Sequence, residues 1–580
     1  MLEALNNMNN HANDKNKFIR RVTEVKNIDK FKCRDVYYDI ANDIKSNRDY
    51  GHAICLVGLR RTGKSTILKQ IYNNCEDFGW KKEEVLYIEL SGMVGNEVID
   101  RDRRNLLKIN NVSDIKTPRL SDVEDFINYY KERENIECIL IDEITLCDDL
   151  ILCGKGFVDY IVDHGYKLVI TGTESVTFKL ANENSLYTRL ILKDTSYISF
   201  GEYCRLKELP MKTLKDKGNA ILKYIKHGNV LDESILLDYE YIESAIGINI
   251  AISLINALEE EFLGSDSDIR SLVESIIKYF RLIGEPITVD KVKDSISKSD
   301  ISRAQRNLIK RGAEFKSSKL SKDKCNIIAI KSAEEIFKKF NLNFDISKIG
   351  LDFKQLGVID RLFNSMNIVY GLNNINVEGN YYDEPIVDLN TLHSFNYNFI
   401  NSISEHIRHD NSIIDKQYRD MLADEVISTA EGIILEDIIC IQFIKQLAKE
   451  RELTNILYNY RDTSFRMERK STNIRVHRYR KKIIDNGNTT EAEIDLIRFK
   501  KDELELIEIK KSKEVIENQT RWLNNDSVID DIKDIIADDI PIKKFVYYLG
   551  EPTTVGDVEY KNIADVLLEQ YEKHFRIMPE

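Results

Sequence analysis

The sequence predicts an α/β protein of several domains, and three features of the chain support this prediction. Its 580 residues exceed what one hydrophobic core usually organises, since single domains typically hold about 100–200 residues. In the N-terminal part, short apolar runs typical of buried strands alternate with segments of helical spacing. Near the C-terminus, an apolar helical stretch precedes two strand patterns that are joined by a charged turn.

The bulk composition limits the classes of protein to which the chain can belong. A net charge of −13 argues against general coating of nucleic acid or anionic membrane, although it leaves room for a local basic site. The nine cysteines include no CxxC pair, which predicts reduced thiols and a cytoplasmic location. The N-terminus lacks the apolar core of a signal peptide, and the most apolar window, residues 244–258, is too short for a membrane span.

A phosphate-binding loop is predicted at residues 58–66, GLRRTGKST. The preceding run HAICLV has the pattern of a buried strand and the following residues have helical spacing, which is the context that GxxxxGK[ST] requires. The glycines let backbone N–H groups turn toward phosphates, the lysine reaches the β- and γ-oxygens, and the serine ligates Mg²⁺. A chance surface turn is the alternative. The predicted ATP contacts are Gly58, Arg61, Thr62, Gly63, Lys64, Ser65 and Thr66.

Two further strands are predicted to complete the site. In ECILIDEITL, Asp142 ends a buried strand and is predicted to hold Mg²⁺ together with Ser65, while Glu143 is the candidate base for the attacking water. In YKLVITGT, Thr171 ends the next strand and is expected to contact the γ-phosphate or that water. Arg189, in LYTRL, is a candidate arginine finger toward a neighbouring subunit, and a salt-bridged surface arginine is the alternative.

Together these segments resemble a family of prokaryotic AAA-type P-loop ATPases. The resemblance rests on GLRRTGKST, ILIDEI, LVITGTES, TRLI with YISFGEY, and YIKHGNVLDE, and it covers about residues 47–233. The sequence departs from the family in having Thr188 where a glycine usually precedes the arginine, and Ile198 where a leucine usually begins the serine–phenylalanine segment. The resemblance implies ATP hydrolysis with Mg²⁺ and self-association through the ATPase domain.

The middle of the chain predicts a winged helix. Residues 266–332 contain three short helical patterns followed by an alternating strand, with residues 302–311 as the recognition helix. The alternative is a lid that packs on the nucleotide domain and contacts no nucleic acid. The candidate phosphate contacts are Arg303, Arg306, Lys310 and Arg311.

Two acids and a lysine are predicted to converge near the C-terminus. In EAEIDLIRFKKDELELIEIKKSK, residues 491–513, two strands enclose the turn RFKKD. Side chains alternate along a strand, so Glu508 and Lys510 share one face, and Asp495 on the preceding strand can meet Glu508. Two carboxylates can bind Mg²⁺ or Mn²⁺, which polarises a phosphodiester, and the lysine orients water or stabilises developing charge.

This D…ExK arrangement is that of the PD-(D/E)XK, or restriction-endonuclease-like, fold. The helical stretch GIILEDIICIQFIKQL carries Glu436, and a helix ahead of the sheet often donates such an acid in this fold. The order of helix glutamate, RD-containing strand at 460–462, Asp495 and ExK also resembles the C-terminal domain fused to the ATPase family above. Residues 465–482 are the most basic segment, with His477 and Tyr479 as candidate nucleic-acid contacts and a solvated hairpin as the alternative.

The sequence therefore predicts a Mg²⁺-dependent ATPase that is coupled to a nuclease-like domain acting on DNA or RNA. Because nuclease-like folds are also reused as binding modules, cleavage stays a hypothesis. The alternative is a regulatory ATP switch in which an inert nuclease-like fold acts on a protein partner. The expected divisions are a helical segment (1–46), an AAA-type core (47–205), a helical lid (206–265), a winged-helix-like module (266–335), a mixed helical connector (336–428) and the nuclease-like domain (429–580).

Overall fold

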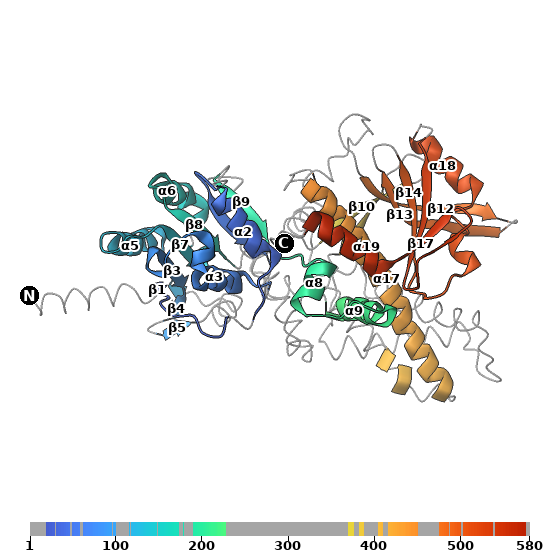
Figure 1. The fold of residues 1–580 in the computed structure, drawn as a ribbon, viewed down its shortest axis with the longest axis horizontal. Helices are drawn as coiled ribbons and strands as arrows, with labels where there is room; N and C mark the ends of the chain where they lie inside the picture. The colour runs from blue at the N-terminus through green and yellow to red at the C-terminus, as the bar shows by residue number, and fades with distance from the viewer. Residues whose placement is uncertain are drawn as a thin grey trace, which may run out of the picture.

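The computed structural model describes two long stretches of the chain and a few shorter ones between them. The described residues are 19–227, apart from 29–30, 47–48, 59–61, 95–96, 100–114, 117, 148, 173–177 and 179–188; 369–375; 382–387; 404–405; 407–409; 416–450; and 475–575, apart from 486–487, 500–502 and 537–539. The predicted winged helix and the RD-containing strand lie outside the described residues. Figure 1 shows an N-terminal body, in blue and teal, and a C-terminal body, in orange and red, with two green helices beside it.

The N-terminal body is a sheet with helices on both faces. Its strand order is β1-β3-β7-β8-β2-β9; β1 runs antiparallel to β3 and all other neighbours are parallel. Strands covered on both faces become continuous apolar runs, which is why the predicted strands at 52–57, 137–146 and 166–173 could be found as β2, β7 and β8. The bounds are β1 Ile19–Arg21, β2 Ala53–Val57, β3 Val85–Leu90, β7 Cys138–Asp142, β8 Lys167–Thr171 and β9 Leu190–Asp194.

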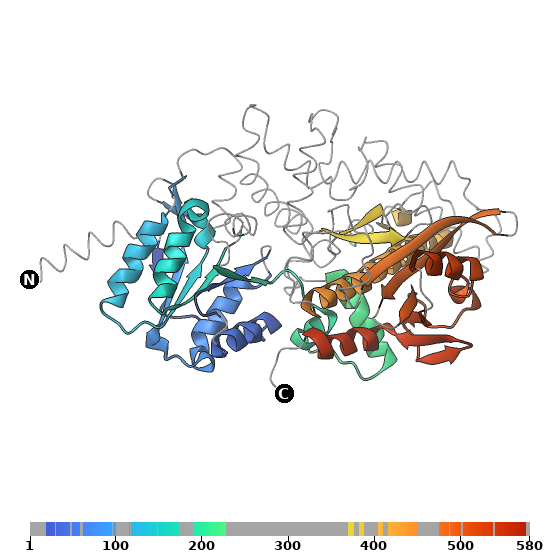
Figure 2. The same cartoon turned by 90° about the horizontal axis from the view of Figure 1, so that it is seen from above.

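Helices cover the two faces of this sheet separately (Figures 1 and 2). One hydrophobic cluster joins α2 and α3 to one face, and another joins α5 and α6 to the opposite face. A small sheet of order β5-β4-β6 follows β3. The bounds are α2 Asp35–Lys45, α3 Lys64–Asn73, α5 Leu120–Lys131, α6 Leu150–Asp163, β4 Gly92–Val94, β5 Glu97–Ile99 and β6 Ile115–Lys116, with the short 3-10 helices η1 Cys75–Phe78, η2 Lys82–Glu84 and η3 Ile144–Leu146.

The sequence predicted a helical segment over residues 1–46, but its described part is not helical throughout. Only α2 is a helix among its described elements, whereas β1 pairs with β3 and extends the N-terminal sheet. The backbone hydrogen bonds that β1 offers satisfy the edge of β3.

The C-terminal body is built on an eight-stranded sheet of order β11-β10-β12-β13-β14-β15-β17-β16. Strands β12, β13 and β14 form an antiparallel meander, and α18 crosses from β14 to the parallel strand β15. Helix α17 packs against one face of this sheet and α18 against the other. The bounds are β10 Val369–Ile375, β11 Tyr382–Val387, α17 Lys416–Glu450, β12 Arg475–Asp485, β13 Asn488–Phe499, β14 Leu504–Ile509, η7 Glu517–Thr520, α18 Asp526–Ile536, β15 Ile542–Tyr548, β16 Thr553–Val555, β17 Val558–Asn562, α19 Ile563–Gln570 and η8 Tyr571–Phe575.

Two predicted domain boundaries differ from this arrangement. The connector 336–428 contributes β10 and β11 to the C-terminal sheet, and α17 already begins within it, at Lys416. Strand β10 pairs with β12 and so continues the ladder of hydrogen bonds that would otherwise end there.

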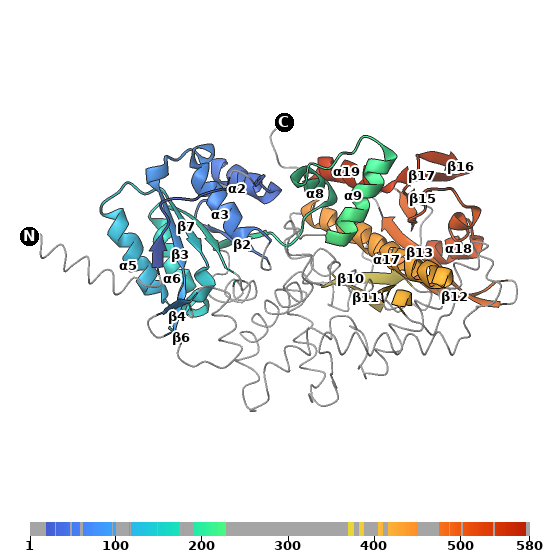
Figure 3. The ribbon, with the colours of Figure 1, turned by 90° about the horizontal axis from the view of Figure 1, so that it is seen from below.

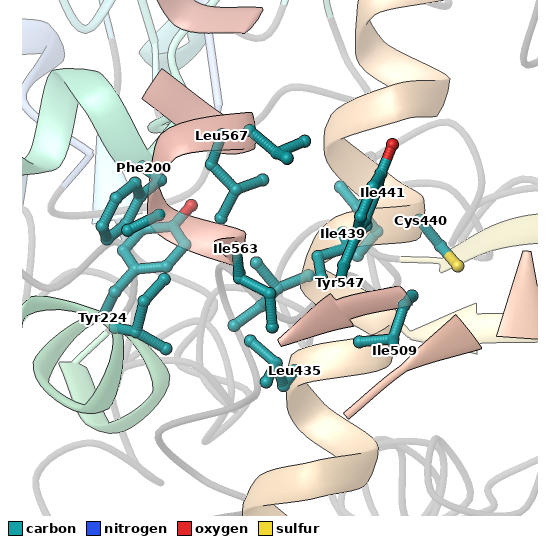
Figure 4. Close-up of a cluster of buried hydrophobic side chains, with 14 of the residues drawn as sticks. Phe200, Tyr224, Leu435, Ile439, Cys440, Ile441, Ile509, Tyr547, Ile563 and Leu567 are labelled. Atoms are coloured by element: carbon teal, nitrogen blue, oxygen red, sulfur yellow. The ribbon is translucent and has the colours of Figure 1, made fainter. Parts of the chain in front are cut away.

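The second difference concerns helices α8 (Phe200–Leu206) and α9 (Leu214–His227), which follow the N-terminal sheet. They pack with α17 and α19 in a single buried hydrophobic cluster of the C-terminal body (Figure 3). Figure 4 shows Phe200 and Tyr224 on the side of α8 and α9 facing Ile563 and Leu567 of α19. The expected boundary at 205–206 therefore cuts through α8. Among the described helices, none is long and apolar enough to cross a membrane.

Candidate functional site

The phosphate loop joins β2 to α3, and two glycines give it its shape. Gly63 is the N-cap of α3 with a φ of 93°, and the first turn of α3 carries no acid. Helix N-termini with this geometry bind anions because the N–H groups and the positive end of the helix dipole meet there. Gly58 has a φ of 142°, and a Cβ at this position would overlap Thr195 Oγ1. The loop therefore has the form of a phosphate cradle; Arg61 lies outside the described residues.

Thr62 and Lys64 of the motif are buried. Lys64 donates from Nζ to the carbonyl oxygen of Gly58 at 2.6 Å. The hydroxyl oxygens of Thr62 and Thr195 lie 2.7 Å apart, and Thr195 Oγ1 donates to the carbonyl of Val57 at 2.9 Å. Thr66 lies in the first turn of α3 and is partly buried.

Three structural elements bring the predicted catalytic side chains to one edge of the sheet. Asp142, at the end of β7, accepts from Ser65 Oγ at 3.1 Å and from Thr171 Oγ1 at 2.5 Å. The hydroxyl and carboxylate oxygens of Ser65 and Asp142 are ligands of the kind that Mg²⁺ prefers, so this pair fits the ion. The sequence predicted Asp142, Ser65 and Thr171 for one site, and their side chains are in contact.

Glu143 follows Asp142 in an unusual backbone conformation. Its φ is 68°, in the left-handed region, and its backbone N–H donates to Thr171 Oγ1 at 3.4 Å. A non-glycine residue held in a sparsely populated region costs about 1–3 kcal/mol, and such strain gathers at functional sites. The turn sets Glu143 at the same edge as Asp142, where it is buried.

Arg189 lies at the opposite edge of the sheet. It immediately precedes β9, and its carbonyl oxygen accepts from the backbone N–H of Ala53 at the start of β2. Because β9 is parallel to β2, this is the amino edge, whereas the phosphate loop follows the carboxyl end of β2. The Arg189 side chain is 35% exposed and pairs with Asp159 at 2.8 Å. Within one chain it does not reach the phosphate loop, and a role toward a neighbouring subunit stays a prediction.

Sequence reasoning missed Arg34, which lies directly behind the phosphate loop. Its side chain is 3% exposed, and its Nη1 donates to the carbonyl oxygens of Thr62 at 2.8 Å and Thr195 at 2.7 Å. Its Nε donates to Glu202 Oε1 at 3.0 Å. No motif marks Arg34; the available signal was Glu202, which lies in the segment YISFGEY that supported the family resemblance.

A second polar cluster lies in the C-terminal body, on β13 and β14. Lys510 Nζ lies 2.9 Å from Asp495 Oδ2 and 2.5 Å from Glu508 Oε2. Asp495 Oδ2 also accepts from the backbone N–H of Ile509 at 2.7 Å. The three residues that were predicted from the D…ExK pattern are therefore in direct contact, with the ammonium between the two carboxylates.

A β-bulge directs Asp495 toward this cluster. The register of β12 and β13 shifts between the pairs His477–Ile497 and Tyr479–Ile494, so two residues of β13 oppose one residue of β12. The two residues are Asp495 and Leu496. Bulges of this kind re-aim side chains and are common next to active sites. Simple alternation along β13 did not predict it.

Burial and mutual repulsion act on the acids of this cluster. The pKa of Glu508 is raised well above its usual value by burial and by the charge of Asp495, and Lys510 offsets only part of this. The pKa of Glu436, on α17, is raised by burial and by the same charge. Burial lowers the pKa of Lys510, but the charges of Asp495 and Glu508 outweigh it, and the net shift is upward.

One oxygen of Glu508 is available as a cation ligand. Glu508 Oε1 is buried and has no hydrogen-bond partner among the residues that the structure describes. A buried carboxylate oxygen without a partner, next to a second buried carboxylate, fits a cation ligand. Within the described part of the chain, no group of three or more His, Cys, Asp or Glu side chains is arranged to hold a metal ion, so Glu436 does not join Asp495 and Glu508 in such a group.

Two residues of the basic segment, Arg478 and Tyr479, have described side chains that lie in the core. Tyr479 is fully buried on β12 and donates its hydroxyl to Asp531 Oδ2 at 2.9 Å, so its ring is not exposed for the predicted contact. Arg478 is also buried, and its Nε donates to the carbonyl oxygen of Asp495 at 3.4 Å. Both side chains stabilise the sheet around the bulge because β12 is covered by helices on both faces. The side chain of His477 is outside the described part.

Comparison with known proteins connects the N-terminal body to one family. Residues 50–204 match the family model of the AAA domain. No curated protein matches the chain. Together with the strand order and the phosphate loop, the match shows an α/β P-loop fold and supports an ATPase of the AAA type.

Two solved structures are similar to the chain at low scores. AMPPCP-bound DnaA from Aquifex aeolicus has 16% sequence identity and a TM-score of 0.21, covering 58% of this chain and 97% of its own. The Aeropyrum pernix ORC1 protein in complex with DNA has 14% identity and a TM-score of 0.19, covering 67% and 97%. At TM-scores this low, neither likeness bears on the function of this chain.

Proposed function

We propose that the chain is a Mg²⁺-dependent ATPase whose N-terminal body acts together with a C-terminal body that binds and cuts nucleic acid. The observation that carries the ATPase part is the contact of Asp142 with both Ser65 and Thr171 beside the phosphate loop. The AAA-domain match over residues 50–204 supports the same activity.

Each residue of the nucleotide site has a distinct role in this proposal. The N-terminal N–H groups of α3 bind the β- and γ-phosphates, and Lys64 leaves the Gly58 carbonyl to reach the same oxygens. Ser65 and Asp142 would hold Mg²⁺, which supplies neutralisation of phosphate charge. Glu143 accepts the proton of the attacking water, and the Thr171 hydroxyl orients that water.

The C-terminal part of the proposal rests on the contacts of Asp495, Glu508 and Lys510. An acid-bearing helix, α17, followed by antiparallel strands that carry these residues supports a restriction-endonuclease-like fold. Asp495 and Glu508 would hold Mg²⁺ or Mn²⁺, which supplies polarisation of a phosphodiester. Lys510 stabilises the negative charge that develops on the phosphate oxygens. DNA and RNA are both open as substrates.

The ATPase part is tested by phosphate release from ATP by the full chain. Lys64→Ala removes the ammonium that contacts the phosphates, and we expect a loss of about 10²-fold or more in kcat. Lys69→Ala is the matched control, because this lysine lies on the same helix beyond the loop. Equal loss in both variants, or none in Lys64→Ala, would contradict the assignment.

The nuclease part is tested with end-labelled DNA and RNA in Mg²⁺ or Mn²⁺, with and without ATP. We expect cutting by wild type, its loss in Glu508→Ala, and loss of its ATP dependence in Lys64→Ala. Glu503→Ala is the control, since Glu503 precedes the same strand and pairs with Lys543 away from the cluster. ATP hydrolysis without any cutting would favour an ATP switch that acts on a protein partner.

A further inference from the structure

We propose that a buried polar network centred on Arg34 and Glu202 couples the phosphate loop to the C-terminal body. The inference rests on the proposed ATP site. It adds a route by which nucleotide binding at the loop changes the structure of the C-terminal body. The network begins at the backbone of the loop, passes through α8, and reaches α17 and η8 by hydrogen bonds.

Arg34 uses all of its hydrogen-bond donors in this network. A guanidinium has five N–H groups, and those of Arg34 have five acceptors. Nη1 donates to the carbonyls of Thr62 and Thr195, Nη2 to the carbonyl of Tyr197 at 2.8 Å, and Nε and Nη2 to the two carboxylate oxygens of Glu202 at 3.0 and 3.3 Å. One side chain therefore fixes the loop, the segment after β9 and α8 relative to one another.

The contact with Thr62 reaches the phosphate-binding atoms directly. The Thr62 carbonyl precedes Gly63, the N-cap of α3, and Lys64. The Thr62 hydroxyl also meets that of Thr195, which in turn donates to Val57 at the end of β2. Any rearrangement of the loop around phosphates changes the lengths of these bonds. Buried hydrogen bonds have narrow optimal distances, so Arg34 would follow such a change.

Glu202 carries the network into the C-terminal body. It lies on α8, and its Oε1 also accepts from the backbone N–H of Asp35 at 3.0 Å. Its neighbours Phe200 and Tyr203 are fully buried in the cluster formed by α8, α9, α17 and α19 (Figure 4). The backbone N–H of Phe200 donates to Gln442 Oε1 of α17 at 3.3 Å. Movement of Glu202 therefore moves α8, which packs against α19 and is bonded through Phe200 to α17, the helix that covers the C-terminal sheet.

A second set of polar contacts, through Asp35, also links the start of α2 to α8 and η8. Arg205 of α8 pairs with Asp35 at 2.7 Å, and the Tyr571 hydroxyl donates to the same carboxylate oxygen at 3.2 Å. Tyr571 begins η8, in the C-terminal body. Arg34 is the N-cap of α2 and Asp35 its first residue, so both links start at the N-terminus of this helix.

The contact between the two bodies through Arg34 and Glu202, called the joint below, is polar, and this favours coupling over a static connection. Burying two charges costs desolvation energy that their attraction does not always recover, and well-packed apolar side chains often stabilise a protein as well. A joint that only holds two bodies together has no need of a buried arginine. One that responds to the position of a carbonyl needs directional hydrogen bonds, which Arg34 supplies.

The test is hydrogen–deuterium exchange of the full chain with and without ATP and Mg²⁺. With ATP and Mg²⁺, wild type is expected to show slower exchange in the loop, residues 57–68. In α8 and in residues 434–446 of α17 we expect the exchange rate to change by about fivefold or more, which corresponds to the low end of the usual coupling between two sites. The double variant Arg34→Met/Glu202→Met removes the charges as a pair and keeps apolar packing. It should keep the change in the loop and lose the change in α8 and α17.

Two further variants guard the interpretation. Arg498→Met/Glu505→Met removes another Arg–Glu pair, which is partly buried within the C-terminal body and has no contact to the loop, and should keep the change in α17. Glu202→Gln keeps an acceptor for Arg34 with less disturbance of folding, and should reduce the change in α17 without affecting the loop.

The outcomes separate the inference from the proposed function. A change in α17 that persists in Arg34→Met/Glu202→Met overturns the coupling. ATP-induced protection of the wild-type loop with no change in α17 overturns it as well, but leaves the ATPase proposal intact. If ATP does not protect the wild-type loop, the ATP site itself is wrong, and the coupling falls with it.

Discussion

Glu143 is the residue whose role depends most on its backbone. The left-handed turn after Asp142 sets the carboxylate of Glu143 at the carboxyl edge of the sheet, while the proposed phosphate contacts lie in the loop before α3 and in its first turn. We expect Glu143→Gln to lower kcat by about 10²–10⁴-fold, the usual contribution of a positioned base, because an amide accepts no proton at neutral pH. Binding of a fluorescent ATP analogue should be unchanged. A variant that turns over ATP at the wild-type rate would remove Glu143 as the base.

Asp35 is predicted to make the stability of the joint depend on pH. Burial and the charge of Glu202 raise its pKa from 3.8 to about 6, against the effect of Arg205 and the hydrogen bond from Tyr571. Between pH 3.8 and 6 the native state binds more protons than the unfolded state. The stabilisation by the protonated Asp35 carboxyl is therefore complete below about pH 4 and is lost as pH rises through 6. The shift corresponds to about 3 kcal/mol at most.

Asparagine in place of Asp35 removes this titration. We expect the free energy of unfolding of wild type, measured with urea, to fall relative to that of Asp35→Asn between pH 4 and pH 6.5. Arg34, Arg205, Glu202 and Tyr571 are the charged and titratable groups that face Asp35, and both proteins keep all of them. A difference that stays constant over this range would show that the pKa of Asp35 is not raised in the native state.

At the scale of helices and strands, the sequence was informative where a local pattern decides the structure. Strands β2, β7 and β8 were predictable because buried parallel strands are continuous apolar runs that end at polar residues. The bulge at Asp495 was not, because it depends on how β12 pairs with β13. The burial of α8 depends on Tyr571, 366 residues from Arg205, and no local signal reports such a partner.

The contact between α8 and η8 gives a prediction for two glycines. A Cβ at Gly201 would overlap the ring of Tyr571, whereas a Cβ at Gly218, on α9, meets nothing within 4 Å. We expect Gly201→Ala to destabilise the chain by about 1–3 kcal/mol through overpacking. Gly218→Ala should stabilise it by about 0.5–1 kcal/mol, since alanine favours helix. Thermal unfolding of both variants provides the comparison, and an equal effect of the two substitutions would contradict the packing of α8 on η8.

For the whole molecule, the division between the two bodies does not follow the order of the chain. Helices α8 and α9 come directly after the N-terminal sheet, yet their apolar side chains belong to the hydrophobic cluster of α17 and α19. They should therefore unfold with the C-terminal body, since cooperative units follow shared packing and not sequence position.

Leu567→Ala and Leu86→Ala test this division in the full chain. Leu567 is fully buried among α8, α17 and α19, and Leu86 is fully buried in the N-terminal sheet beneath α5 and α6. Each truncation should cost about 2–5 kcal/mol. We expect Leu567→Ala to speed hydrogen exchange in α8, α9 and α17 with β2 and β7 unchanged, and Leu86→Ala to do the reverse. If the exchange in α9 responded to Leu86→Ala instead, α8 and α9 would belong to the N-terminal body, and the Arg34 network would lie within one unit and not between two.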